Sequence, residues 1–151
     1  MLVISFLAFI TQFISFGALI ILPLFSDGIG ATYIETGLIY AVFALPTIFE
    51  APFSIFTERF ERKTVLIIGG LASVLFLGGA FVSDSITSLF IFTLLMALAF
   101  ALINPVIDGT ATELMPKHKI GELNGVYRSV VLLAATIGSF IVGPVADKFS
   151  I

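Results

Sequence analysis

Five long stretches that are almost free of charge divide this chain of 151 residues. A helix needs roughly 20 apolar residues to cross the hydrocarbon core of a membrane, and each stretch has about that length. Because 59% of the residues are hydrophobic and only 11% are charged, the chain has too few ionised side chains to cover a water-soluble particle. We therefore expect the chain to lie in a lipid bilayer.

The apolar stretches predict helices, because backbone groups in hydrocarbon must form their hydrogen bonds within the protein. The runs are continuous and lack the alternation of two faces that a membrane-spanning β-barrel requires. The predicted fold class is an all-α polytopic transmembrane helix bundle, which forms a single transmembrane domain over residues 1–151. The helices are expected near residues 2–25, 33–57, 63–83, 87–113 and 124–146.

Lysine and arginine gather after the second and fourth predicted spans and at the start of the fifth. The cations on this side of the membrane are Arg59, Arg62, Lys63, Lys117, Lys119 and Arg128. On the opposite side the connections and the tail contain one cation, Lys148. The positive-inside rule then predicts that the N-terminus is cytoplasmic and that the end of this segment lies outside the cell membrane. Tyr33 and Tyr127 fall near span ends and are expected at the membrane interface.

The connection after the second span resembles the loop signature of the major facilitator superfamily, G-x-x-x-D-R-x-G-R-K. In this chain residues 54–63 read Ser-Ile-Phe-Thr-Glu-Arg-Phe-Glu-Arg-Lys. Ser54 and Glu61 stand where the family usually has glycine. The positions that match the signature or conserve its charge are Glu58, Arg59, Arg62 and Lys63. We treat these four residues and Ser54 as a candidate cytoplasmic gating loop.

Further segments support the resemblance, so that it covers essentially the whole chain. They are Asn104-Pro105 in the fourth span, Glu113-Leu-Met-Pro116 after it, Gly125-Val-Tyr127-Arg128 at the start of the fifth, and Gly143-Pro144-Val-Ala-Asp147-Lys148 at its end. Members of this family usually have two six-helix halves with the solute held between them. The resemblance therefore implies that the chain is a fragment, five of the six helices of one half. It favours the second half only slightly over the first.

The function that the resemblance implies is secondary active transport of a small solute by alternating access, coupled to protons. The partners would be the lipid bilayer, the solute and the missing second half of the transporter. Spans one, two, four and five would line the central cavity, and span three would support them from the lipid side. A non-transporting membrane scaffold or assembly module is the alternative, because its composition would look the same.

The gating loop can be interpreted in two ways. Glu58 and Arg62 are four residues apart, a spacing that pairs side chains on one helix face. The resemblance also implies that an arginine of this loop meets an acid on the fourth span, where Asp108 and Glu113 are available. Such a latch would hold two helices together in one conformation. The alternative is a basic loop that only fixes topology; we favour the latch.

Three charged residues fall inside predicted spans. Glu50 lies about 10 Å inside the cytoplasmic end of the second span, from a rise of 1.5 Å per residue, and Asp108 lies at a similar depth. An ionised carboxylate there costs roughly 2–3 kcal/mol, so it needs a partner, water or a proton. Glu50, Asp108 and Arg128 are therefore expected to meet at one level. Either acid is a candidate for proton coupling, and a static ion pair between helices is the alternative.

Other polar residues give weaker indications. Gln12 and Asn104 lie inside spans and are candidates for the solute path, although hydrogen bonds between helices explain them equally well. His118 is the only histidine and the chain has no cysteine, so we expect no metal site and no cofactor. No set of catalytic residues indicates an enzyme, and no basic patch indicates a nucleic-acid partner.

Overall fold

The computed structural model describes residues 2–57 and 59–149, and every regular element in this part of the chain is a helix. The elements are α1 (Leu2–Gly28), α2 (Tyr33–Ala44), η1 (Leu45–Phe49), α3 (Glu50–Thr57), α4 (Arg62–Phe81), α5 (Ile86–Glu113), η2 (Lys117–Lys119) and α6 (Ile120–Phe149). Together α2, η1 and α3 make one rod, so five helical segments are long and apolar enough to cross a membrane. The predicted all-α bundle is confirmed.

Three helix ends differ from the expected bounds by three residues or more. The first helix continues to Gly28, and the last runs from Ile120 to Phe149 in place of residues 124–146. Apolar runs mark only the part of a helix that lies in hydrocarbon, whereas helical hydrogen bonds continue into the polar interface. Most of the added residues are polar or small, such as Asp27, Gly28 and Glu122.

Side chains at the helix starts explain where the second and fourth spans begin. Thr32 caps α2: its hydroxyl accepts a hydrogen bond from the backbone N–H of Glu35, whose carboxylate accepts one from the backbone N–H of Thr32. Ser85 caps α5 by accepting from the N–H of Ser88. The turn before α2 uses Gly30 at φ 85°, a conformation that glycine adopts at little steric cost.

Two of the prolines inside spans, Pro46 and Pro105, have different effects. Pro46 lies in the short 3-10 segment η1, where the second span passes from α2 into α3. Because proline cannot donate a backbone hydrogen bond, it favours such a local change of helical geometry. Pro105 lies inside α5, which continues past it to Glu113. The interruption is therefore confined to the second span, directly before Glu50.

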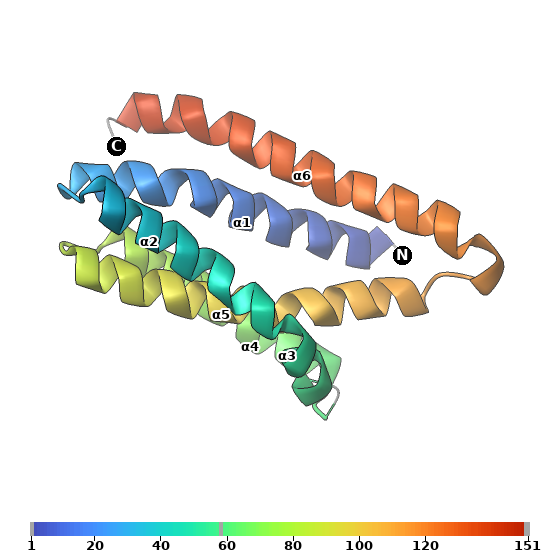
Figure 1. Cartoon of the computed structure of the whole chain (residues 1–151). Coiled ribbons are helices and arrows are strands. Elements are labelled where there is room, and N and C mark those ends of the chain that lie inside the picture. The colour runs from blue at the N-terminus through green and yellow to red at the C-terminus, as the bar shows by residue number, and fades with distance from the viewer. Residues whose placement is uncertain (1, 58, 150–151) are drawn as a thin grey trace.

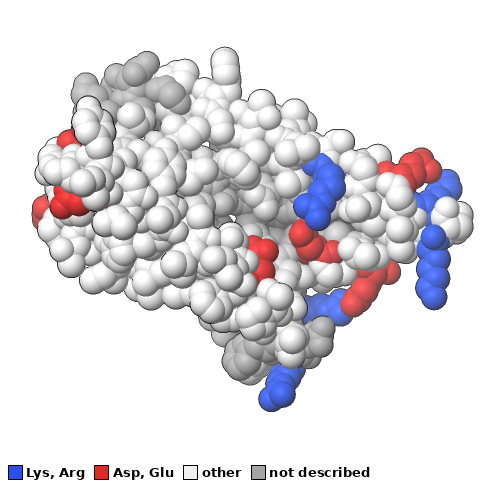
Figure 2. All heavy atoms as spheres, in the orientation of Figure 1, with Lys and Arg blue, Asp and Glu red and all other residues white. Residues whose placement is uncertain are grey.

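The chain crosses back and forth, so that its polar connections alternate between two ends. Figure 1 shows the N-terminal end of α1 at the same end as the α3–α4 and α5–α6 connections, while α6 finishes at the opposite end. Among the described side chains, lysine and arginine lie in the half of the molecule that holds these two connections (Figure 2). The structure thus gathers the lysine and arginine side chains that it describes at one end of the bundle.

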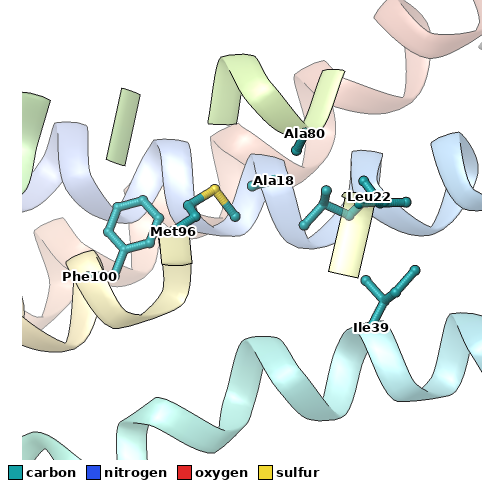
Figure 3. Close-up of a cluster of buried hydrophobic side chains, with 7 residues drawn as sticks. Ala18, Leu22, Ile39, Ala80, Met96 and Phe100 are labelled. Carbon is teal, nitrogen blue, oxygen red and sulfur yellow. The ribbon is translucent and has the colours of Figure 1, made fainter. Parts of the chain in front are cut away.

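Helix α5 is the centre of the bundle and contacts α1, α2, α3, α4 and, more weakly, α6. Figure 3 shows one cluster of its buried side chains, in which Met96 and Phe100 of α5 approach Ala18 and Leu22 of α1. Ile39 of α2, Ala80 of α4 and Leu89 of α5 complete this cluster. By contrast, α4 exposes a row of large apolar side chains along its outer face. These are Ile67, Ile68, Leu71, Val74 and Leu75, which suit contact with lipid.

Helix α6 packs mainly along α1, and a glycine allows their close approach. A Cβ atom built on Gly138 would lie 2.8 Å from the backbone oxygen of Phe13, closer than real Cβ contacts. Gly17 of α1 faces Val142 of α6 in the same interface. Small residues let helix backbones approach in this way, and close packing is what holds helices together in lipid.

The α1–α6 contact gives the first prediction, which compares two glycines of one helix. We expect Gly138→Ala to destabilise the protein by about 1–3 kcal/mol, because the added methyl group forces the helices apart. Gly125→Ala is the matched control, since a Cβ atom there has nothing within 4 Å. It should be neutral or slightly stabilising, because alanine favours the helix. Thermal unfolding of both variants in detergent measures the difference; equal melting temperatures would contradict the packing described here.

Candidate functional site

An ion pair joins the third and fourth spans at the basic end of the bundle. Arg62, the first residue of α4, donates two hydrogen bonds to Glu113, the last residue of α5, at 2.5 and 2.6 Å. Each guanidinium nitrogen faces its own carboxylate oxygen, which is the bidentate geometry that arginine favours. The side chains are 52% and 60% exposed, so water can compete for both partners. The contact is directional, and a helix movement can break it.

This ion pair shows which of the two candidate acids on the fourth span binds the loop arginine. Arg62 meets Glu113, whereas Asp108 binds elsewhere. The expected pairing of Glu58 with Arg62 stays a prediction. Glu58 itself lies outside the described residues. Arg59 and Lys63 of the same loop are exposed.

A small cavity of about 140 Å³ lies beside the ion pair, between α3, α4 and α5. Besides Arg62 and Glu113, its walls include Ser54, Thr57, Phe60, Pro105, Gly109 and Thr110. Ser54, one of the positions where the family signature has glycine, thus lies on the cavity wall, and its hydroxyl donates to the backbone oxygen of Ala51 at 2.8 Å. A polar pocket therefore lies beside the Arg62–Glu113 contact, which a movement of α4 relative to α5 can break.

Glu50 has a neutral partner on α5. Its Oε1 atom accepts a hydrogen bond from the Nδ2 atom of Asn104 at 3.4 Å. Glu50 is the first residue of α3 and is half-buried, and Asn104 is also half-buried. The sequence indicated that Glu50 needs a partner and treated Asn104 as a separate candidate for the solute path. The structure brings these two residues together, with a long and therefore weak bond.

Asp108 is held by a tyrosine that sequence analysis had placed at the membrane interface. The hydroxyl of Tyr127 donates to Oδ1 of Asp108 at 2.6 Å, and Tyr127 is only 3% exposed. Tyr127 is thus buried between helices, whereas Tyr33 is 97% exposed. A usable signal existed in the sequence: Asp108 precedes the η2 turn (Lys117–Lys119) by nine residues and Tyr127 follows it by eight, so the two helices of the hairpin bring them to a similar height.

The expected meeting of Glu50, Asp108 and Arg128 is only partly present. The three residues lie on α3, α5 and α6, and Figure 2 shows acidic and basic atoms beside a hollow near the middle of one face. Arg128 is exposed, and among the described residues no ion pair links it to either acid. Its neighbour Tyr127 is the residue of α6 that reaches Asp108. A neutral donor binds each acid in place of the expected cation.

The remaining candidates contribute less to this site. Gln12 is half-buried on α1. Its neighbour Thr11, and not Gln12, lines a cavity of about 180 Å³ between α1, α4 and α5. His118 lies in η2, which has no buried residue. Within the described ranges no group of three or more His, Cys, Asp or Glu side chains could hold a metal ion. The polar contacts between helices are thus the features of the site that carry chemistry.

Comparison with known proteins agrees with this arrangement. Residues 4–151 match the sequence profile of the Major Facilitator Superfamily. The chain is also 28% identical over 136 residues to an uncharacterized MFS-type transporter of Methanocaldococcus jannaschii, MJ1560. This alignment covers 87% of the chain and 34% of that relative, so the chain spans about a third of the relative's length.

Proposed function

The chain belongs to the Major Facilitator Superfamily, and from this membership we propose that it works as part of a secondary transporter that moves a small solute by alternating access. The superfamily points to a membrane transporter and not to an enzyme. The five membrane-spanning helices make the chain a multi-pass membrane protein that contacts the bilayer. We further propose that it acts together with additional helices, including the second half of the transporter, since the relative is about three times as long.

The observation that carries the proposal is the ion pair between Arg62 and Glu113. Alternating access needs contacts that favour one state and are lost in the other. This pair is exposed, joins the ends of two spans and borders the cavity lined by Ser54 and Thr110. We propose that it is a latch that holds this end of α4 and α5 closed, with Arg59 and Lys63 as the surrounding basic loop.

Proton coupling is the finer part of the proposal and rests on the two acids inside the spans. Glu50 and Asp108 are both half-buried and both bind neutral donors. Carboxyl groups inside membrane spans are rare, and they often belong to proton pathways. We propose that Glu50 or Asp108 takes up the coupled proton, and that Asn104 and Gln12 lie along the solute path.

The latch predicts a defined response to charge reversal. Arg62→Glu should repel Glu113 and open this end, whereas Arg62→Glu combined with Glu113→Arg should restore the closed state. Since this chain has no cysteine, Thr110→Cys on the cavity wall can report opening in the longer protein once any other cysteines are removed. We expect a membrane-impermeant maleimide to label it roughly fivefold faster or more in the single variant.

Arg59→Glu is the matched control for the latch, because it makes the same charge change on an exposed residue of the same loop. It should leave labelling of the cavity wall unchanged. If Arg59→Glu and Arg62→Glu accelerate labelling equally, the effect comes from the net charge of the loop and the latch is wrong.

Proton coupling is tested with the longer protein in proteoliposomes that contain a pH-sensitive dye. Candidate solutes added in turn should drive proton movement, and Glu50→Gln should reduce this movement at least about tenfold because its amide cannot bind and release the proton. Glu122→Gln changes an exposed acid on α6 and should have no effect. Solute-driven proton movement that survives Glu50→Gln would exclude Glu50 and leave Asp108→Asn as the second variant to measure.

The orientation in the cell membrane is also a proposal, with the basic end cytoplasmic. His118→Cys lies in the connection between α5 and α6, and Asp84→Cys lies in the connection between α4 and α5; both positions are exposed. In intact cells an impermeant thiol reagent should label residue 84 and should reach residue 118 only after the membrane is permeabilised. The reverse pattern would invert the proposed topology.

A further inference from the structure

Helix α6 is joined to the rest of the bundle in an uneven way. It packs along the length of α1 but touches α5 only slightly, although α5 and α6 are consecutive. Figure 1 shows α1 between α6 and the other helices over much of their length. Packing therefore resists separation of α6 from α1 far more than separation of α6 from α5.

The hydrogen bond from Tyr127 to Asp108 compensates for this weak packing. Among the described residues, it is the side-chain hydrogen bond that ties α6 to another helix, and it is short, at 2.6 Å. The ring of Tyr127 is buried in a cluster that includes Ala8 of α1, and Ile107 and Ala111 of α5. One phenol thus links the three helices that meet at this end.

The two partners differ in their access to water. Tyr127 is 3% exposed, whereas Asp108 is half-buried. Of the two partners, Asp108 is therefore the one that is partly open at the surface of this chain. The hydroxyl of Tyr127 can donate to the ionised carboxylate in a charge-assisted bond, which is roughly twice as strong as a bond between neutral groups. Protonation of Asp108 removes that charge and weakens the link.

Some of the other charged side chains at this end already bind a partner. On α3, Glu50 binds Asn104, and on α4, Arg62 binds Glu113. On α6, Arg128 is exposed and directly follows Tyr127. Helix α1 adds no charged side chain here, because its one acid, Asp27, lies at the other end. The further charged or titratable side chains at this end are Arg59, Glu61, Lys63, Lys117, His118, Lys119 and Glu122.

We propose that Tyr127 is a positioning residue that acts through Asp108: its hydroxyl holds α6 against α5 while Asp108 is ionised and releases α6 when Asp108 takes a proton. The proposal rests on the proton-coupled transport proposed above and deepens it. It names the contact that turns proton binding into helix movement. No covalent bond changes, and the proton passes from water to a carboxylate oxygen of Asp108.

The test measures the distance between α5 and α6 as the pH is lowered. Spin labels are attached to Gly109→Cys on α5 and Gly125→Cys on α6, where an added side chain has open space. The full-length protein in lipid nanodiscs is examined by electron paramagnetic resonance without solute. In the otherwise unchanged protein, the fraction with a longer distance should rise at low pH.

Two variants separate the roles of the partners. Tyr127→Phe removes the donor, so the long distance should be populated about tenfold more at high pH, and the response to pH should disappear. Asp108→Asn is uncharged, like the protonated acid, and cannot titrate, so it should show the long distance at every pH. This second variant tests the proposal even if Tyr127→Phe proves unstable.

The control removes a polar link at the opposite end of the bundle. Ser26 of α1 is fully buried and lies 3.0 Å from the hydroxyl of Thr36 on α2, with no titratable group in the contact. Ser26→Ala should retain the full pH response of the α5–α6 distance. Loss of the response in Ser26→Ala as well would show that any weakened helix contact has this effect, and the proposal would fall.

The remaining outcomes separate this proposal from the proposed function. A distance that does not change with pH, or that still titrates in Tyr127→Phe or Asp108→Asn, overturns the role of Tyr127 even if proton-driven transport is present. A pH response that depends on both residues supports the contact even if proteoliposomes show no solute-driven proton movement, and in that case proton-coupled transport is the part that fails.

Discussion

The structure depends on the burial of helix α5 at the centre of the bundle. In lipid, burying an apolar helix contributes little free energy. In the apolar window of α5, 44% of the residues are buried, compared with 17% in the window of α4. Lipid tails are as apolar as leucine, so moving such side chains from lipid into the bundle yields little hydrophobic free energy. Close van der Waals packing and polar contacts must therefore hold the other helices on α5. This explains why a glycine, Gly138, occupies a position where two helix backbones approach.

The polar contacts at the basic end share a common partner. Glu50 on α3 binds Asn104, Arg62 on α4 binds Glu113, and Tyr127 on α6 binds Asp108. In each case the second partner belongs to α5. A movement of α5 relative to any one neighbour therefore breaks a different contact, and each contact differs in chemistry. The first is a weak bond between an acid and an amide, the second is an exposed ion pair, and the third is a short bond from a buried phenol.

Part of this site could be predicted from the sequence. An arginine after the second span and an acid late in the fourth had to lie at the same end of the bundle, which limited the partner of Arg62 to two acids. In the structure Arg62 binds Glu113, because the first turn of α4 lies beside the last turn of α5. For Glu50 the sequence required a partner but could not name Asn104. For Asp108 it suggested Arg128, whereas the adjacent residue, Tyr127, faces inward.

The sequence by itself determined the number of spans, their approximate bounds and the gathering of cations at one end. The physical reason is that a backbone in hydrocarbon must be helical, and apolar length then sets where each helix crosses. Only the tertiary structure decided which side chains meet. A helix that is apolar on all sides gives no signal for its rotation, and each residue turns the helix by about 100°. Choosing Tyr127 over Arg128 therefore required the packing of α6 against α1 and α5.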